Sequence, residues 1–160
     1  MEQPLHRRKP TLYFVNSMSD LFHEEIPDRF LDRVFSVIEE TSHHIYQILT
    51  KRSDRLRRYF AGCVIPENTW LGVSVEDRRH RIPRIEDLRG INASVRFISA
   101  KPLLEDIGEI DLDGIHWVIT GRESGPKAGQ PNETIPLLTE RRTEVFGSQI
   151  KFVFVEIALS

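Results

Sequence analysis

Polar and charged side chains that could bind a ligand follow the apolar runs of this sequence, at the point where each run ends. The first run ends in Asn16, and later ones end in lysine, arginine, serine or glutamate. If the runs are parallel strands, their carboxyl ends meet at one edge of a sheet, where such sheets place their binding sites. The candidate site residues are Asn16, Ser17, Asp20, Lys51, Arg52, Ser74, Glu76, Ser99, Lys101, Gly121, Glu123 and Ser124.

The residue types in this set favour a polar ligand with an anionic part. Lys51 and Arg52 supply positive charge for a carboxylate or phosphate, and the serine hydroxyls supply orienting hydrogen bonds. A purely structural interpretation stays open, because Ser, Asp and Asn are also common caps and turn residues. The set therefore predicts a binding site without giving any single residue a catalytic role.

The loop from Gly121 to Gly129 (GRESGPKAG) is rich in glycine. Its glycines allow backbone conformations that turn N–H groups towards an anion, and Glu123 could accept a hydrogen bond from a ribose or an amine. A surface turn would have the same composition. Elsewhere, His23 precedes two glutamates, but no second histidine stands at ligand spacing, so the sequence predicts no metal site.

The segment KRSDRLRRYF, residues 51–60, is strongly basic and ends in two aromatic residues. Its cations could contact phosphates, while Tyr59 and Phe60 could stack on bases. Its amphipathic spacing and its alternation with Asp54 favour a solvated helix face instead. Nucleic-acid association is therefore kept as an alternative function.

An alternation of strands and helices must position these residues. The apolar runs predicted as strands are Thr11–Asn16, Ile45–Lys51, Thr69–Val75, Val95–Ala100, Ile115–Gly121 and Lys151–Ile157. Nearly continuous apolar runs with helical spacers are typical of a parallel sheet buried on both faces. Trp70 and Trp117 lie inside runs and are predicted to pack in the core, as is Cys63.

The first predicted helix follows the first run. Pro27 suits a first helical turn, and Phe30, Val34 and Ile38 repeat at helical spacing up to Glu40.

Later helices have less regular patterns. Ser53 is a good N-cap for a short basic helix, and residues 136–146 predict a helix before the last run. The stretch before Gly90 contains Pro83, which predicts a break or a late start, because proline removes a backbone donor and clashes with the preceding turn.

Together these elements predict an α/β fold: a partial (βα) barrel of the TIM type, with about six mainly parallel strands and outer helices. No G-x-G-x-x-G follows the first strand, which argues against a dinucleotide-binding sheet. Residues 1–160 are expected to form a single domain, a truncated barrel with a flexible segment at residues 1–10. An open barrel leaves two strand edges, which favour a homo-oligomer or a partner chain.

The amino-acid composition excludes several classes of protein. The 160 residues include 22 Lys and Arg against 24 Asp and Glu, so the net charge of −2 gives no global attraction for nucleic acid or membrane. One cysteine excludes an internal disulfide and a self-contained cysteine metal site. The sequence has neither a bilayer-length apolar run nor the apolar core of a signal peptide, so a cytoplasmic location without membrane contact is expected.

A resemblance to one phage and bacterial family of unknown function, the phage protein Gp37/Gp68 type, is carried by five segments in order: NSMSDLFHEEIPDRFLDRVF, QILTKRSDRL, NTWLGVSVED, VRFISAKPLLEDI and HWVITGRESGPKA. It extends from about Leu12 to Ala128. Members of that family resemble radical S-adenosylmethionine enzymes, in which a cysteine-rich stretch precedes a partial TIM-type barrel. The resemblance therefore implies S-adenosylmethionine and an iron–sulfur cluster for full-length relatives.

The sequence departs from this family where the chemistry would lie. Relatives carry three cluster-binding cysteines near the N-terminus, whereas this chain has Cys63 alone, so no cofactor is expected in it. Lys101 stands where the family has an acid, Arg122 where it has a second glycine, and from about Asn132 the resemblance fades.

The resemblance implies the barrel portion of a radical-SAM-like prophage protein, without cluster-dependent catalysis in this chain. If the family is enzymatic, its chemistry is expected to be of the radical-SAM type. The alternatives are a binding or assembly module and a nucleic-acid-associated phage protein.

Overall fold

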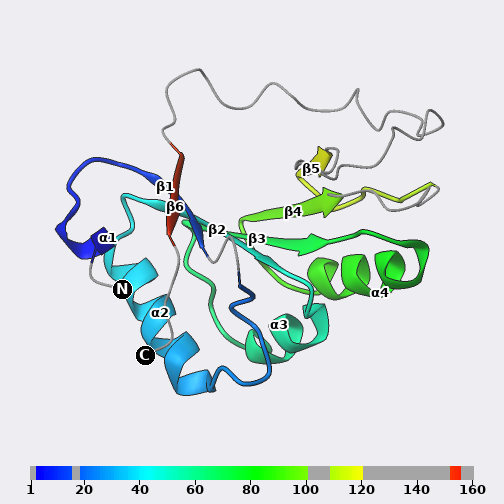
Figure 1. Cartoon of the computed structure of the whole chain (residues 1–160), viewed down its shortest axis with the longest axis horizontal. Helices are drawn as coiled ribbons and strands as arrows, with labels where there is room; N and C mark the ends of the chain where they lie inside the picture. Colours follow the sequence, from blue (N-terminus) through cyan, green and yellow to red (C-terminus); the bar gives the residue numbers. More distant parts are fainter. Residues whose placement is uncertain (1–2, 16–18, 101–108, 121–151, 156–160) are drawn as a thin grey trace, which may run out of the picture.

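The computed structural model describes residues 3–15, 19–100, 109–120 and 152–155 (Figure 1). The strands are β1 (Leu12–Val15), β2 (Ile45–Thr50), β3 (Thr69–Ser74), β4 (Val95–Ala100), β5 (Trp117–Thr120) and β6 (Phe152–Val155). The helices are α1 (Gln3–His6), α2 (Asp28–Glu40), α3 (Ser53–Tyr59) and α4 (Arg78–Arg89). A strand thus lies within each of the six predicted runs.

The strands form one parallel sheet in the order β5-β4-β3-β2-β1-β6. Strands β1 to β5 lie side by side in chain order, and β6 pairs with the other edge of β1. Strands β1 to β4 advance in one direction across the sheet, so right-handed crossovers place the helices between them on the same face. Helices α2, α3 and α4 do lie together on one side (Figure 1). The predicted α/β class is confirmed, and the strand order is consistent with a partial barrel.

The helix-covered face of the sheet holds the larger core. Alternate strand residues such as Tyr13, Ile48 and Leu71 point into it and are fully buried. The predicted apolar stripe of α2 is confirmed, with Val34 and Ile38 buried against these strands.

The opposite face of the sheet carries a smaller cluster of Leu12, Trp70 and Phe97, with Trp117 packed against it. The predicted packing of both tryptophans is therefore confirmed. The ring of Phe97 lies so close to the backbone of Gly72 that a Cβ there would overlap the ring, so this close approach requires glycine.

The prediction of a helix break at Pro83 was wrong. Helix α4 runs unbroken from Arg78 to Arg89 with Pro83 inside it. Proline leaves the carbonyl of Arg79 without its amide donor, but both residues are exposed, so water can satisfy that oxygen. The predicted helix at residues 136–146 lies outside the described residues.

The prediction that Cys63 is buried was also wrong. Its side chain is exposed, because it lies in the turn that Gly62 makes after α3 with a φ of 79°. None of the helices described above is both long and apolar enough to cross a bilayer.

Candidate functional site

Six of the predicted site residues lie in the described part of the chain, at the carboxyl edge of the sheet: Asp20, Lys51, Arg52, Ser74, Glu76 and Ser99. The other six lie outside it: Asn16, Ser17, Lys101, Gly121, Glu123 and Ser124. Ser74 and Ser99 are register partners on β3 and β4, and each exposes only 5% of its surface. We call Lys51, Ser74, Glu76 and Ser99 the strand-end site.

An ion pair joins two members of the strand-end site. The Nζ atom of Lys51 lies 2.5 Å from Oε1 of Glu76. Thr50 is the register partner of Val73, so Lys51 lies beside Ser74 on the neighbouring strand. The Lys51 side chain is half exposed, whereas that of Glu76 is 17% exposed. A pair at the solvent boundary contributes at most about 1 kcal/mol, so an incoming ligand can replace it at small cost.

Asp20 serves mainly to hold the chain together. Its carboxylate accepts hydrogen bonds from the Thr50 hydroxyl (2.6 Å), from the backbone N–H groups of Lys51 (2.9 Å) and Phe22 (3.0 Å), and from the Arg52 guanidinium (3.3 Å). These donors fix the loop after β1 to the turn after β2. The oxygens of the Asp20 carboxylate already accept hydrogen bonds from the protein, and Arg52 is one of the donors. Asp20 and Arg52 therefore position the strand-end site rather than bind its ligand.

Helix α4 fixes the other flank of the site. Arg84 donates to the backbone carbonyl of Ser74 at 2.7 Å. Asp77 caps the helix by accepting from the His80 N–H at 2.8 Å, and its carboxylate also contacts the His80 imidazole. These hydrogen bonds from His80 lower the pKa of Asp77. Sequence reasoning missed Arg84 and Asp77, although an aspartate just before a helix is a recognisable N-cap signal.

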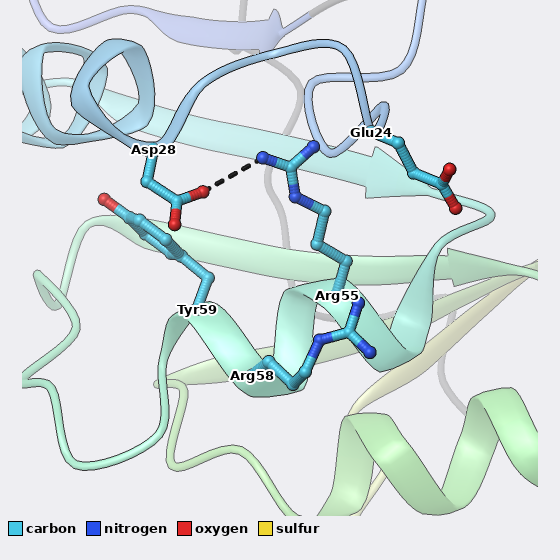
Figure 2. Close-up of a pocket in the computed structure, with 5 residues that line it drawn as sticks. All are labelled: Glu24, Asp28, Arg55, Arg58 and Tyr59. Atoms are coloured by element: carbon cyan, nitrogen blue, oxygen red, sulfur yellow. Dashed lines mark hydrogen bonds and ion pairs between the residues drawn. The ribbon is translucent and has the colours of Figure 1, made fainter.

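A surface hollow of about 480 Å³ lies between the loop after β1 and helix α3 (Figure 2). It is lined by Glu24, Asp28, Arg55, Arg58 and Tyr59. Arg55 spans its floor, donating to the carbonyls of His23 and Ile26 and to the Asp28 carboxylate at 3.0 Å. Arg55 is therefore a clamp that joins the loop carrying Asp20 to α3.

Two more polar side chains of this hollow, Arg58 and Tyr59, also have partners within the protein. Arg58 pairs with Asp54 at 3.1 Å, and the Tyr59 hydroxyl donates to Asp32 at 2.9 Å. Burial first, and then the Asp32 carboxylate, raise the pKa of the Tyr59 hydroxyl, so it stays protonated at neutral pH. The hollow is thus a structural joint, and the strand-end site is the better candidate for ligand binding.

The residues present do not fit an iron–sulfur cluster. Cys63 is the single cysteine of the sequence, whereas the resemblance implies three. Cys63 follows the carboxyl end of α3, so it lies towards the amino edge of the sheet, away from Lys51 and Glu76. Within the described ranges, no group of three His, Cys, Asp or Glu side chains could hold a metal ion.

A family model for proteins of unknown function, DUF5131, matches residues 1–156. The match covers nearly the whole sequence, so the chain belongs to this family. No curated protein and no solved structure matches it. The predicted membership in an uncharacterised family is confirmed at this level.

Proposed function

We propose that this DUF5131 protein is the barrel part of a cytoplasmic, phage-type protein related to radical S-adenosylmethionine enzymes. In this proposal the strand-end site binds a small polar ligand that carries an anionic group, and this chain performs no cluster-dependent catalysis. The sequential parallel sheet supports the relationship, because barrels of that kind bind ligands at the carboxyl ends of their strands.

The observation that carries the proposal is the Lys51–Glu76 ion pair beside two buried serines. The ammonium of Lys51 suits a carboxylate or phosphate, and the carboxylate of Glu76 suits an amine or a ribose hydroxyl. The hydroxyls of Ser74 and Ser99 can donate or accept, so they can orient either kind of group. S-adenosylmethionine offers a carboxylate, an amine and a ribose together, which makes it the first ligand to test.

Isothermal titration calorimetry tests the proposal, with S-adenosylmethionine, S-adenosylhomocysteine, adenosine and methionine as separate titrants. We expect the two complete ligands to bind and Glu76→Gln to weaken them at least about tenfold, since a charge-assisted hydrogen bond contributes about 1.5 kcal/mol or more. Glu39→Gln removes an exposed carboxylate on α2 and serves as the matched control. The proposal is wrong if neither complete ligand binds, or if both variants weaken binding equally.

Reconstitution with iron and sulfide tests the second part of the proposal. We expect the purified chain to acquire no cluster absorbance and no stoichiometric iron, because one thiol cannot replace three. Stoichiometric iron and sulfide that survive desalting would contradict it.

An assembly role is the alternative that the sheet edges favour. Strands β5 and β6 are the outer strands of the sheet, and unpaired strand edges recruit further strands. Sedimentation equilibrium distinguishes the two functions: a stable oligomer that binds none of the four titrants favours assembly.

A further inference from the structure

Gln47 is a buried polar side chain in the middle of β2, and it exposes only 3% of its surface. Within the described ranges its amide forms no hydrogen bond. The amide of Asn68, although only half-buried, donates to three backbone carbonyls. Buried amides in proteins almost always have hydrogen-bond partners, so the Gln47 amide points to a ligand that supplies them.

Gln47 lies on the face of the sheet opposite α2, α3 and α4, which we call the Trp70 face (Figure 1). Leu49, two residues further along β2, packs against the cluster around Trp70 on that face. Ser74 lies four residues beyond Trp70 on β3 and is therefore on the same face, with its register partner Ser99 beside it. Gln47 and the serines of the strand-end site thus face the same side of the sheet.

The spacing between Gln47 and the strand-end site suits one elongated ligand. Gln47 is the register partner of Trp70, and Ser74 follows Trp70 by four residues. At about 3.3 Å per residue, the two rows lie about 13 Å apart along the strands. A nucleoside that carries an amino-acid chain is elongated in this way, with its base at one end and its charged groups at the other.

Aromatic residues flank Gln47 on both neighbouring strands. Phe14 of β1 and Trp70 of β3 are its register partners, so the three side chains form one row across the Trp70 face. Leu49, the next residue of β2 on this face, is also apolar. An amide among apolar and aromatic side chains suits a planar heterocycle, whose faces pack on the apolar groups while its edge binds the amide.

We propose that Gln47 recognises the adenine edge of the ligand that binds at the strand-end site. The inference rests on the proposed function, which supplies the class of ligand. Adenine presents an amino donor next to a ring-nitrogen acceptor, and the glutamine amide presents the complementary oxygen and NH₂ group. The amino-acid end of the same ligand then lies at Lys51 and Glu76.

Calorimetry on the parent protein tests the inference with two probes, S-adenosylhomocysteine and its analogue without the 6-amino group of adenine. We expect S-adenosylhomocysteine to bind about fivefold more tightly, because the analogue loses one hydrogen bond to the Gln47 amide. Equal affinity for the two probes contradicts the inference and leaves the proposed function intact. If neither probe binds, both are wrong.

The variant Gln47→Met assigns the preference to this side chain, since methionine has a similar length but no amide. Its affinity for S-adenosylhomocysteine should fall about tenfold or more, and its preference over the analogue should disappear. The matched control is Leu49→Met, on the same strand and the same face, which should keep the fivefold preference. The inference is wrong if Gln47→Met keeps the preference or if the control loses it as well.

Thermal melting separates recognition from a structural role of the amide. Gln47→Met should melt no lower than the parent, because it removes a buried polar group that has no partner in the described structure. A melting temperature several degrees below that of the parent would show that the amide serves the fold, and it would contradict the inference.

Discussion

Polar side chains lie at both the carboxyl and the amino edge of the sheet, but the two groups differ in how far solvent reaches them. At the carboxyl edge, Lys51 and Glu76 pair with each other at the solvent boundary. At the amino edge, His44 and Tyr13 are completely buried, and Nδ1 of His44 and the Tyr13 hydroxyl have no hydrogen-bond partner in the described structure. A ligand can reach the first group of side chains without unfolding the protein, whereas the second group is inside the core.

The amino edge is a joint between α1, the end of α2 and the start of β2. His44 contacts the Pro4 carbonyl at 3.2 Å through Nε2, and His43 contacts the Arg7 carbonyl at 2.9 Å. The hydroxyls of Thr41 and Tyr46 lie 2.6 Å apart. Burial raises the pKa of Tyr46 to about 12, so its hydroxyl remains neutral and able to donate.

The two ends of the strands are thus expected to have different roles. Polar groups at the amino edge hold backbone carbonyls in place and are expected to contribute stability, whereas the strand-end site is expected to contribute binding. The same asymmetry is general in barrels, whose catalytic ends and stabilising ends are opposite. Asp20 is the exception, because it lies at the carboxyl edge and yet binds backbone and side-chain donors of its own chain.

Replacing Asp20 should give the largest loss of stability, although Asp20 lies at the carboxyl edge of the sheet. Asp20→Ala removes an acceptor that serves four donors, including the Thr50 hydroxyl and the Lys51 N–H. At about 1 kcal/mol for each hydrogen bond, we expect a loss of about 4 kcal/mol in the free energy of unfolding, measured by urea denaturation. Asp54→Ala, which removes an exposed carboxylate paired with Arg58, should cost less than about 1 kcal/mol. A loss equal to that of the control would mean that Asp20 is free to bind a ligand.

Asn68 tests the structural character of the amino edge. Its Nδ2 donates to the carbonyls of Ile38 (2.9 Å), His44 (3.0 Å) and Thr41 (3.3 Å), which closes the end of α2. Asn68→Ala leaves these oxygens without that donor and should cost about 2 kcal/mol of unfolding free energy. Calorimetric ligand affinity should be unchanged.

The control for this experiment is the exposed Asn92, whose replacement by alanine should cost less than about 0.5 kcal/mol. If Asn68→Ala weakened ligand binding without lowering stability, the two edges would not be separate in function.

His44 makes the amino edge sensitive to acid. Burial lowers the pKa of its imidazole below the ordinary 6.5, and the charges of His43 and Arg7 act in the same direction, although the hydrogen bond to Pro4 opposes them. Below pH 6.5 the unfolded chain therefore takes up a proton that folded His44 resists, so stability falls as the pH falls from 6.5 towards the folded-state pKa.

Denaturation at pH values on either side of 6.5 measures this dependence. The loss attributable to His44 cannot exceed about 1.4 kcal/mol for each pH unit, and the variant His44→Gln should lose correspondingly less stability on acidification than the parent. Equal slopes for the parent and His44→Gln would contradict a buried neutral imidazole.

Short-range sequence patterns predicted the strands and helix α2 well, because the spacing of apolar residues along a strand or helix determines which side chains are buried. The apolar run Val95–Ala100 is β4 to the residue, and the spacing of Val34 and Ile38 predicts the buried face of α2. Parallel pairing then brings Ser74 and Ser99 together, as expected from their places at strand ends.

Contacts between residues distant in sequence could not be predicted in the same way. Asp20 and Thr50, or His44 and Pro4, are 30 and 40 residues apart, and no periodicity links them. The errors have a similar cause: the effect of Pro83 depends on whether the Arg79 carbonyl reaches water, which only the packed helix decides.

The smallest change in stability is expected for a substitution in the strand-end site, at Glu76. Glu76→Gln keeps the shape of the side chain but removes the charge that faces Lys51. Because the lysine is half exposed, solvent can replace this partner, and we expect a change of less than about 1 kcal/mol in the free energy of unfolding. The same variant should lose at least about tenfold in ligand affinity. A residue with little effect on folding and a large effect on binding is what a ligand-binding edge requires, whereas a loss of several kcal/mol would place Glu76 with Asp20 among the residues that hold the fold.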